Sequence, residues 1–286
     1  MSSTERLAGP APTSLVLIGH PVSHSLSPRF QQAALDAAGK PVRYTARDVP
    51  PHAVPETLRS LRASGGAGNV TVPHKEAVAR ECAVLTPVAH RAGAVNTFGV
   101  DARGVLVGHN TDVEGAQQAI RAVMLGNAPT SALVLGAGGS AAAVLLALEA
   151  LGVTRIDVSA RSRDRAEALI QRLALTHIAR TVGEPRCDAD TGIVINTTPL
   201  GLHADDPAPL ALPSLSSTCA VLDLVYRPGE TAWVREARAR GHRAEDGLRM
   251  LVAQGAAAYA WWFGEAADVT AMWRVLEPRS PVATPS

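Results

Sequence analysis

The feature that most constrains the fold of this chain is a glycine-rich turn between a short apolar run and a long alanine- and leucine-rich run. The sequence LVLGAGGSAA places Gly136, Gly138 and Ala141 at the G-x-G-x-x-G/A spacing. The first glycine permits a tight turn, the second lets a pyrophosphate approach the backbone, and the third small residue lets helix and strand pack closely. An ordinary strand-to-helix turn is the alternative. The spacing, strand and helix together predict a dinucleotide site formed by Gly136, Ala137, Gly138, Gly139 and Ser140.

The end of the next expected strand bears on which dinucleotide is bound. NAD enzymes usually place an acidic residue there to hold both ribose hydroxyls, whereas this strand ends in SARSRDR. A 2′-phosphate could be bound here by the planar guanidinium of Arg161, the hydroxyl of Ser162 and the second positive charge of Arg165. We therefore predict NADP(H) as the cofactor. The alternative is that Arg163 and Arg165 only begin an exposed helix.

The alternation of β-like and helix-like runs predicts an α/β protein with two lobes. Short apolar runs such as LVLIG, GNVTVP, SALVLG and GIVINTT are separated by helical patterns. A chain of 286 residues also exceeds the length at which single cores usually divide. We predict an N-terminal α/β substrate lobe over residues 13–112, which begins with parallel-sheet units and is rejoined by C-terminal helices at about 248–277. A C-terminal Rossmann domain with a doubly wound parallel sheet is predicted over 113–247.

Composition excludes several classes of protein. The chain is 47% apolar and 19% charged, which is typical of a folded globular protein. Its 27 basic and 26 acidic residues give a net charge of +1, so we expect neither nucleic acid nor a membrane as a partner. Cys82, Cys187 and Cys219 form no C-x-x-C pair, which favours a reducing cytoplasm. No metal is predicted, because no metal-binding spacing joins His20, His24, His74 and His109.

Lysine is rare in this chain, since the 27 basic residues are 25 arginines and two lysines, Lys40 and Lys75. An ammonium can give up its proton and a guanidinium effectively cannot, so only lysine can act as an acid or base. In NVTVPHKE, Lys75 is expected after a strand and in the first turn of a helix, where the dipole repels a cation. This position favours the neutral amine and proton transfer, although an ordinary surface lysine fits the same pattern.

Two other expected helix starts carry polar residues. HSLSP places Ser27 at the N-cap position before a proline, and Ser25 is not needed for that cap. Two hydroxyls at a helix N-terminus suit a carboxylate. Asp112 in GHNTDVEG follows Thr111, which forms a possible capping box with Glu114, so a purely structural role for Asp112 is also open.

In order along the chain, the segments HSLSP, NVTVPHKE, AGAVNT, NTD, GAGGS, LDLVYRPGE and MLVAQ resemble the shikimate dehydrogenase family. The resemblance extends from GHPVSHSLSP to GLRMLVAQ and thus over most of the chain. It implies reversible hydride transfer between NADPH and the ketone of 3-dehydroshikimate, giving shikimate, in a cleft between the lobes. It also implies a place in aromatic amino acid biosynthesis, in the chorismate pathway.

The resemblance implies roles for individual residues as well. Lys75 and Asp112 would form the catalytic pair, in which the ammonium supplies a proton to the developing alkoxide and the carboxylate orients the ammonium. The substrate would be bound by Ser25, Ser27, Thr71, Asn96, Tyr226 and Gln254. Besides residues 136–140, the cofactor would contact Arg161, Ser162, Arg165, Thr197, Leu224 and Gly247.

Four positions depart from the pattern usual in that family: Gln31, His109, Ala160 and Arg249. None of them removes a proposed catalytic group. They keep open a quinate- or aminoshikimate-type dehydrogenase, and a non-catalytic sensor of the same metabolites is a further alternative. The expected molecule is a monomer or homodimer that binds a small-molecule substrate.

Overall fold

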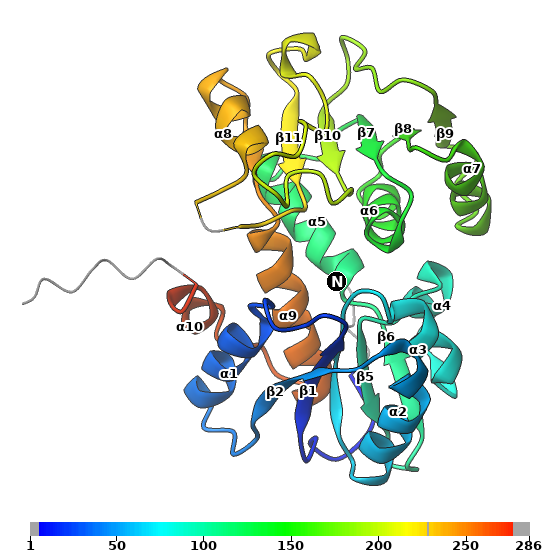
Figure 1. Ribbon diagram of the computed structural model, residues 1–286, viewed down its shortest axis with the longest axis vertical. Coiled ribbons are helices and arrows are strands. Elements are labelled where there is room, and N and C mark those ends of the chain that lie inside the picture. The colour runs from blue at the N-terminus through cyan, green and yellow to red at the C-terminus, as the bar shows by residue number, and fades with distance from the viewer. Residues whose placement is uncertain (1–5, 228, 277–286) are drawn as a thin grey trace, which may run out of the picture. The chain divides into compact units, whose positions relative to one another are not determined.

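The computed structural model describes residues 6–227 and 229–276 (Figure 1). The last position of the predicted returning segment, residue 277, lies outside the described residues. The described chain divides into two compact units. The first comprises residues 6–89, 93–109 and 255–276, and the second comprises residues 90–92 and 110–254. Each unit contains one six-stranded sheet.

The first unit has a mixed sheet with the strand order β2-β1-β3-β5-β6-β4. Its strands are β1 (Leu15–Gly19), β2 (Tyr44–Asp48), β3 (Ala67–Val70), β4 (Val84–Leu85), β5 (Thr97–Val100) and β6 (Leu106–His109). The strands β1, β2 and β3 are parallel, as are β4 and β6, whereas β5 runs antiparallel to both β3 and β6. The parallel pairing expected for the first three strands is therefore confirmed, and β5, whose direction was not predicted, is the antiparallel strand of this sheet.

A tight turn explains the antiparallel strand. The Asp101 carboxylate accepts hydrogen bonds from the backbone N–H groups of Arg103 and Val105, both at 2.9 Å, and Gly104 has a φ of +74°. These contacts fold residues 101–105 into a hairpin connection, which only antiparallel strands can use. The chain thus returns beside β5 as β6.

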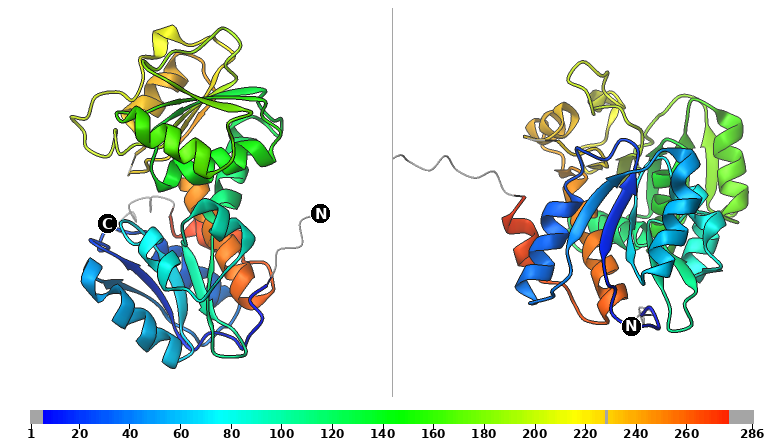
Figure 2. Two further views of the ribbon diagram at one scale, coloured as in Figure 1. Left: turned by 90° about the vertical axis from the view of Figure 1, so that its right-hand side faces the viewer. Right: turned by 60° about the horizontal axis from the view of Figure 1, so that its bottom comes forward.

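The helices of the first unit cover its sheet (Figures 1 and 2). Hydrophobic side chains from the strands, including Ile18, Val70 and Phe98, pack with Leu58 and Val78 from the helices in one buried cluster. The helical segments are α1 (Ser27–Ala37), η1 (Pro51–Ala53), α2 (Val54–Ala63), α3 (Lys75–Glu81), α4 (Pro87–Ala92), whose last three residues belong to the second unit, and α10 (Val269–Arg274). Helix α9 (Leu248–Phe263) crosses the division between the units at residues 254 and 255.

The second unit has an all-parallel sheet with the order β12-β11-β10-β7-β8-β9. The chain proceeds outward from β7 through β8 and β9, then returns to place β10 on the other side of β7. This is the Rossmann order, which confirms the predicted fold class, and its switch point lies between β7 and β10. The strands are β7 (Ser131–Leu135), β8 (Arg155–Ser159), β9 (Ala179–Val182), β10 (Ile193–Asn196), β11 (Ala220–Asp223) and β12 (Ala244–Glu245).

Helices flank this parallel sheet, as Figure 2 shows. Residues 141–148 of α6 are all buried, so this helix is apolar on every side because it lies within the core. Among the described residues, no helix is both long and apolar enough to cross a membrane. The helical segments are α5 (Asp112–Val123), α6 (Gly139–Ala150), α7 (Arg163–Arg172), η2 (Leu212–Ser214) and α8 (Ala232–Ala239).

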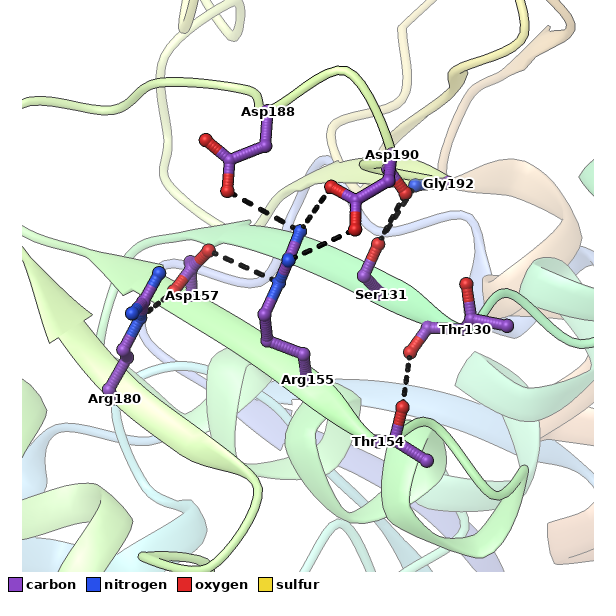
Figure 3. Close-up of polar contacts among 9 residues, drawn as sticks. All are labelled: Thr130, Ser131, Thr154, Arg155, Asp157, Arg180, Asp188, Asp190 and Gly192. Carbon is purple, nitrogen blue, oxygen red and sulfur yellow. Dashed lines mark hydrogen bonds and ion pairs between the residues drawn. The ribbon is translucent and has the colours of Figure 1, made fainter.

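A charged network lies at the amino-terminal edge of the parallel sheet (Figure 3). The Arg155 guanidinium lies 2.7 Å from a carboxylate oxygen of Asp190 and 3.5 Å from one of Asp188. The Ser131 hydroxyl donates to the main-chain oxygen of Asp190 at 2.6 Å. These contacts tie the segment before β10 to the starts of β7 and β8.

We expect Arg155→Gln to lower Tm by about 2–4 °C, because the substitution breaks an ion-pair network that is largely exposed. Thermal unfolding of the two purified proteins at the same pH and salt measures the shift. Steady-state constants should not change, because the glycine turn and the loops after β10 and β11 lie at the opposite, carboxyl edge of the strands. An unchanged Tm would show that the network contributes nothing to stability.

Candidate active site

The glycine turn directly follows β7 at the switch point of the parallel sheet. Gly136 has a φ of +115°, and a Cβ built on it would lie 2.5 Å from Oγ1 of Thr197. Only glycine satisfies both constraints. The Thr197 hydroxyl donates to the main-chain oxygen of Leu135 at 2.7 Å, which holds Thr197 against the turn. The structure thus brings the predicted residues Gly136 and Thr197 together.

The next two glycines have a different surrounding. A Cβ built on Gly138 or Gly139 meets no heavy atom within 4 Å, so packing among the described residues does not require glycine here. Gly138 is the N-cap of α6, whose first backbone N–H groups have no side-chain cap. Helix N-termini of this kind bind anions, and a pyrophosphate can approach a backbone without side chains closely. The turn therefore has the donors and the space that a dinucleotide needs.

The arginines after β8 differ in their partners. Ser162 is the N-cap of α7, and its Oγ accepts a hydrogen bond from the backbone N–H of Arg165 at 3.3 Å. Arg163 donates to Glu167 at 2.7 Å within the same helix. Arg161 and Arg165 are exposed. The alternative of a helix-solvating arginine therefore fits Arg163, and the Ser162 hydroxyl can still donate its own proton to a phosphate.

Two buried polar residues at the ends of β10 and β11 were not predicted from the sequence. Asn196 donates through Nδ2 to Oδ1 of Asp223 at 2.8 Å, and Asp223 also accepts from the Thr231 hydroxyl at 2.8 Å and the Val225 N–H at 3.1 Å. Asn196, Asp223 and Thr231 are all 0% exposed. Burial raises the pKa of Asp223 above its usual value. In the sequence, the apolar runs IVIN and AVLD each end in a polar residue, and this pattern could have identified the pair.

This network fixes the two loops that carry predicted cofactor residues. Thr197 follows Asn196 directly, and Leu224 follows Asp223. A Cβ on Gly247 would lie 2.1 Å from the main-chain oxygen of Leu224, so glycine is required at this contact. Tyr226 lies two residues further along the same loop, and burial raises the pKa of its phenol. The structure therefore brings the predicted residues Leu224 and Gly247 together.

The first unit gathers three predicted residues at the carboxyl end of β3. Thr71 follows β3 and donates its backbone N–H to Ile18 of β1 at 2.9 Å. Lys75 is the first residue of α3, as the sequence predicted. The main-chain oxygen of Lys75 accepts a hydrogen bond from the Val95 N–H at 3.0 Å. The residue after Val95 is Asn96, whose main-chain oxygen accepts from the Val70 N–H at 2.8 Å. Thr71, Lys75 and Asn96 are thus held on neighbouring backbone segments.

The start of α1 differs from the sequence prediction. Ser27 is the first helical residue, and Leu26 occupies the N-cap without a side-chain hydrogen bond. Ser25 instead accepts the Ser27 backbone N–H through Oγ at 3.2 Å. The predicted N-cap role of Ser27 is therefore wrong, because the preceding serine supplies the oxygen at this turn. Ser27 remains buried.

The start of α5 also lacks the predicted capping box. Thr111 occupies the N-cap but makes no side-chain cap, and Oδ1 of Asn110 accepts the Asp112 backbone N–H at 3.0 Å. Within the same unit, a Cβ on Gly115 would lie 2.9 Å from Cβ of Gln254, so α5 and α9 cross closely there. Gln254 thus packs beside Gly115, which lies one helical turn along α5 from Asp112, and both Gln254 and Asp112 are buried.

His109 ends β6 and is packed in the first unit. Its ring stacks on Trp261 with centroids 5.1 Å apart, and Nδ1 lies 2.9 Å from the Thr86 hydroxyl. Burial lowers the pKa of His109 from 6.5 to about 4. The folded protein therefore favours the neutral ring. Among the described residues, no three His, Cys, Asp or Glu side chains form a group that could hold a metal ion.

The low pKa of His109 predicts an acid-dependent loss of stability. The unfolded chain takes up a proton near pH 6.5 while the folded chain resists it down to about pH 4. Stability is thus complete above pH 6.5 and falls by about 3 kcal/mol as the pH drops to 4. Urea unfolding at pH 7.5, 6 and 5 measures this change, of which about 2 kcal/mol should be lost by pH 5. His109→Gln should lose less stability over the same range, and parallel curves for the two proteins would contradict the prediction.

The parallel sheet with its glycine turn at the switch point defines a dinucleotide-binding α/β protein. Two family models match the chain: the shikimate dehydrogenase substrate binding domain at residues 17–98 and the shikimate 5′-dehydrogenase C-terminal domain at residues 247–277. The shikimate dehydrogenase (NADP(+)) of Symbiobacterium thermophilum is 43% identical over 269 residues, covering 90% of this chain and 91% of that protein. The chain belongs to the shikimate dehydrogenase family.

Solved structures agree with this assignment. The structure of shikimate 5-dehydrogenase from Thermus thermophilus in complex with NADP(H) and shikimate matches with a TM-score of 0.80 and 37% identity, covering 92% of this chain and 97% of that chain. The quinate dehydrogenase from Corynebacterium glutamicum in complex with NAD matches with a TM-score of 0.83 and 30% identity, covering 93% and 98%.

Proposed function

We propose that this chain reduces 3-dehydroshikimate to shikimate with NADPH, reversibly, and that Lys75 and Asp112 are its catalytic pair. Shikimate dehydrogenase (NADP(+)) relatives at 40% identity or more, each aligned over about nine-tenths of this chain, carry the activity. This reaction belongs to aromatic amino acid biosynthesis. The combination of the glycine turn with Lys75 at the start of α3 supports the assignment of the chemistry to this chain.

The chemistry requires a hydride on the carbonyl carbon and a proton on the developing alkoxide. When bound, NADPH supplies the hydride. The Lys75 ammonium stabilises the negative charge on the oxygen and donates the proton, and in the reverse direction the amine takes that proton back. In this assignment the Asp112 carboxylate would orient the ammonium and balance its charge.

Binding residues are assigned by the chemistry of their side chains. The hydroxyls of Ser25 and Ser27 would bind the substrate carboxylate, and Thr71, Asn96, Tyr226 and Gln254 would bind its ring hydroxyls. The backbone of residues 136–140 would hold the pyrophosphate, and Arg161, Ser162 and Arg165 would hold the 2′-phosphate. Thr197, Leu224 and Gly247 would line the nicotinamide side. The substrate lobe would comprise residues 13–112 with about 248–277, and the NADP domain residues 113–247.

The test is absorbance at the nicotinamide band on mixing the purified protein with NADP⁺ and shikimate, then with quinate. We expect turnover with shikimate and a lower kcat/KM with quinate. Binding of both ligands without turnover would identify a sensor, and a higher kcat/KM for quinate would reassign the substrate. The oligomeric state, monomer or homodimer, and the cytoplasmic location remain predictions.

A further inference from the structure

A line of buried polar side chains crosses the sheet of the first unit. Asn69 on β3 and Thr97 on β5 are directly opposed in the antiparallel register, so their side chains lie on the same face. Tyr44 on β2 pairs with Leu15 of β1, and Asn69 on β3 pairs with Leu17 of β1. Because Leu15 and Leu17 are two residues apart and point to the same face, Tyr44 lies on that face as well. All three polar residues are at most 5% exposed. Buried polar groups need partners, so their hydrogen bonds must be mutually consistent.

The direction of these hydrogen bonds is set by one obligate acceptor. The main-chain oxygen of Asn96 can only accept, and it lies 3.2 Å from the side-chain amide of Asn69. The nearer amide atom of Asn69 must therefore be Nδ2, and Oδ1 must point the other way. There Oδ1 accepts from the Tyr44 phenol at 2.7 Å. Burial raises the pKa of Tyr44, so this phenol keeps the proton that it donates.

The same logic continues to the Asn96 side chain. Nδ2 of Asn69 also donates to the Thr97 hydroxyl at 2.9 Å. A hydroxyl has one proton, and Thr97 directs it to Oδ1 of Asn96 at 3.1 Å. The orientation of the Asn96 carboxamide is thereby fixed: Oδ1 accepts from Thr97, and Nδ2 acts as a donor toward its own partners.

We propose that Tyr44, Asn69 and Thr97 are positioning residues, which orient Asn96 so that its Nδ2 donates to a ring hydroxyl oxygen of the substrate. The inference rests on the proposed function, in which Asn96 binds that substrate. Asn96 is well placed for this role, because its neighbour Val95 is hydrogen bonded to the main chain of Lys75.

We call the chain of hydrogen bonds from Tyr44 through Asn69 and Thr97 to Asn96 the relay. Thr97→Val tests it, because this substitution keeps the shape of the side chain and removes the hydroxyl. We expect KM for shikimate to rise about three- to tenfold, the effect of one misdirected hydrogen bond. KM for NADP⁺ should not change, because the predicted cofactor residues belong to the other unit. Thr97→Ser restores the hydroxyl and should return KM to the wild-type value. Tyr44→Phe should raise KM for shikimate in the same direction by a smaller factor.

Shikimate analogues that each lack one ring hydroxyl locate the contact. For one analogue the penalty of Thr97→Val should disappear, since the oxygen that Asn96 binds is then absent. Arg155→Gln serves as the stability control, since it should lower Tm without changing either KM. If Thr97→Val does not fold, Tyr44→Phe is compared with Thr97→Ser instead. KM for shikimate should rise in Tyr44→Phe and stay at the wild-type value in Thr97→Ser.

Three outcomes would overturn the relay: an unchanged KM for shikimate in the folded variants, an equal rise in both KM values, or the same penalty with every analogue. The kinetics use whichever ring polyol the wild-type protein oxidises. Failure of the wild-type protein to turn over any of them would instead overturn the proposed function. The two failures are thus distinguishable.

Discussion

Replacing Lys75 by alanine is expected to lower kcat for shikimate oxidation by about 10²–10⁴, the contribution of a positioned acid or base. KM for shikimate should change much less, because the amine acts mainly on the charge that develops in the transition state. Steady-state kinetics with saturating NADP⁺ measures both constants. The far-ultraviolet circular dichroism spectrum of the variant should match that of the wild-type protein.

Lys40 provides the matched control, since it is the other lysine of the chain. Its ammonium lies 2.7 Å from the Glu265 carboxylate and 5.2 Å from the centroid of the Phe263 ring, within the first unit. Lys40→Ala should leave kcat within about twofold of wild type, because exposed ion pairs of this kind contribute little. A kcat for Lys75→Ala that equals the Lys40→Ala value would remove Lys75 from the mechanism.

Replacing both Arg161 and Arg165 by alanine is expected to raise KM for NADP⁺ by about 10²-fold or more. Each charge-assisted hydrogen bond to a phosphate contributes about 1.5–3 kcal/mol, and the variant loses both arginines. KM for NAD⁺, which has no 2′-phosphate, should change little. The preference for NADP⁺ over NAD⁺ should therefore collapse, and initial rates with the two cofactors measure it.

Arg163→Ala is the control on the same helix turn. Arg163 is already paired with Glu167 at 2.7 Å, so its loss should not change the ratio of the two kcat/KM values. An equal effect of Arg163→Ala and of the double variant would show that general positive charge attracts the cofactor and that no phosphate site is built there.

The sequence was sufficient to predict the Rossmann domain because its determinants are local. The glycine spacing, the apolar strand before it and the helix after it all lie within about 20 residues, and Gly136 is indeed required by both its φ and its contact with Thr197. Lys75 was predicted correctly at a helix start for the same reason. Short strands without a continuous apolar run, such as β4 and β12, were missed.

Where prediction failed, the cause was competition between nearby polar groups. Ser27 was expected to cap α1, but Ser25 supplies the oxygen, and Asn110 takes the place expected for Thr111 at α5. Spacing alone does not show which of two adjacent oxygens will accept a given N–H. The antiparallel β5 was also not predicted, because the turn at residues 101–105 is closed by the Asp101 side chain and not by a familiar turn dipeptide.

The contacts that set the predicted binding residues depend on long-range pairing. Asn196 meets Asp223, and Asn69 meets Tyr44 and Thr97, only because parallel and antiparallel neighbours bring distant segments into register. Periodicity identifies such residues as strand positions and does not identify their partners. The sequence therefore predicts which residues bind, and the structure shows what holds these predicted residues in place.

The most direct test of proton transfer by Lys75 is a stopped-flow measurement of NADPH formation by Lys75→Arg. A guanidinium keeps the positive charge and cannot exchange its proton in this pH range. If Lys75 transfers the proton, the first turnover of Lys75→Arg should be as slow as that of Lys75→Ala. If charge alone is needed, Lys75→Arg should retain a rate close to wild type, and that result would contradict the role assigned here to the amine.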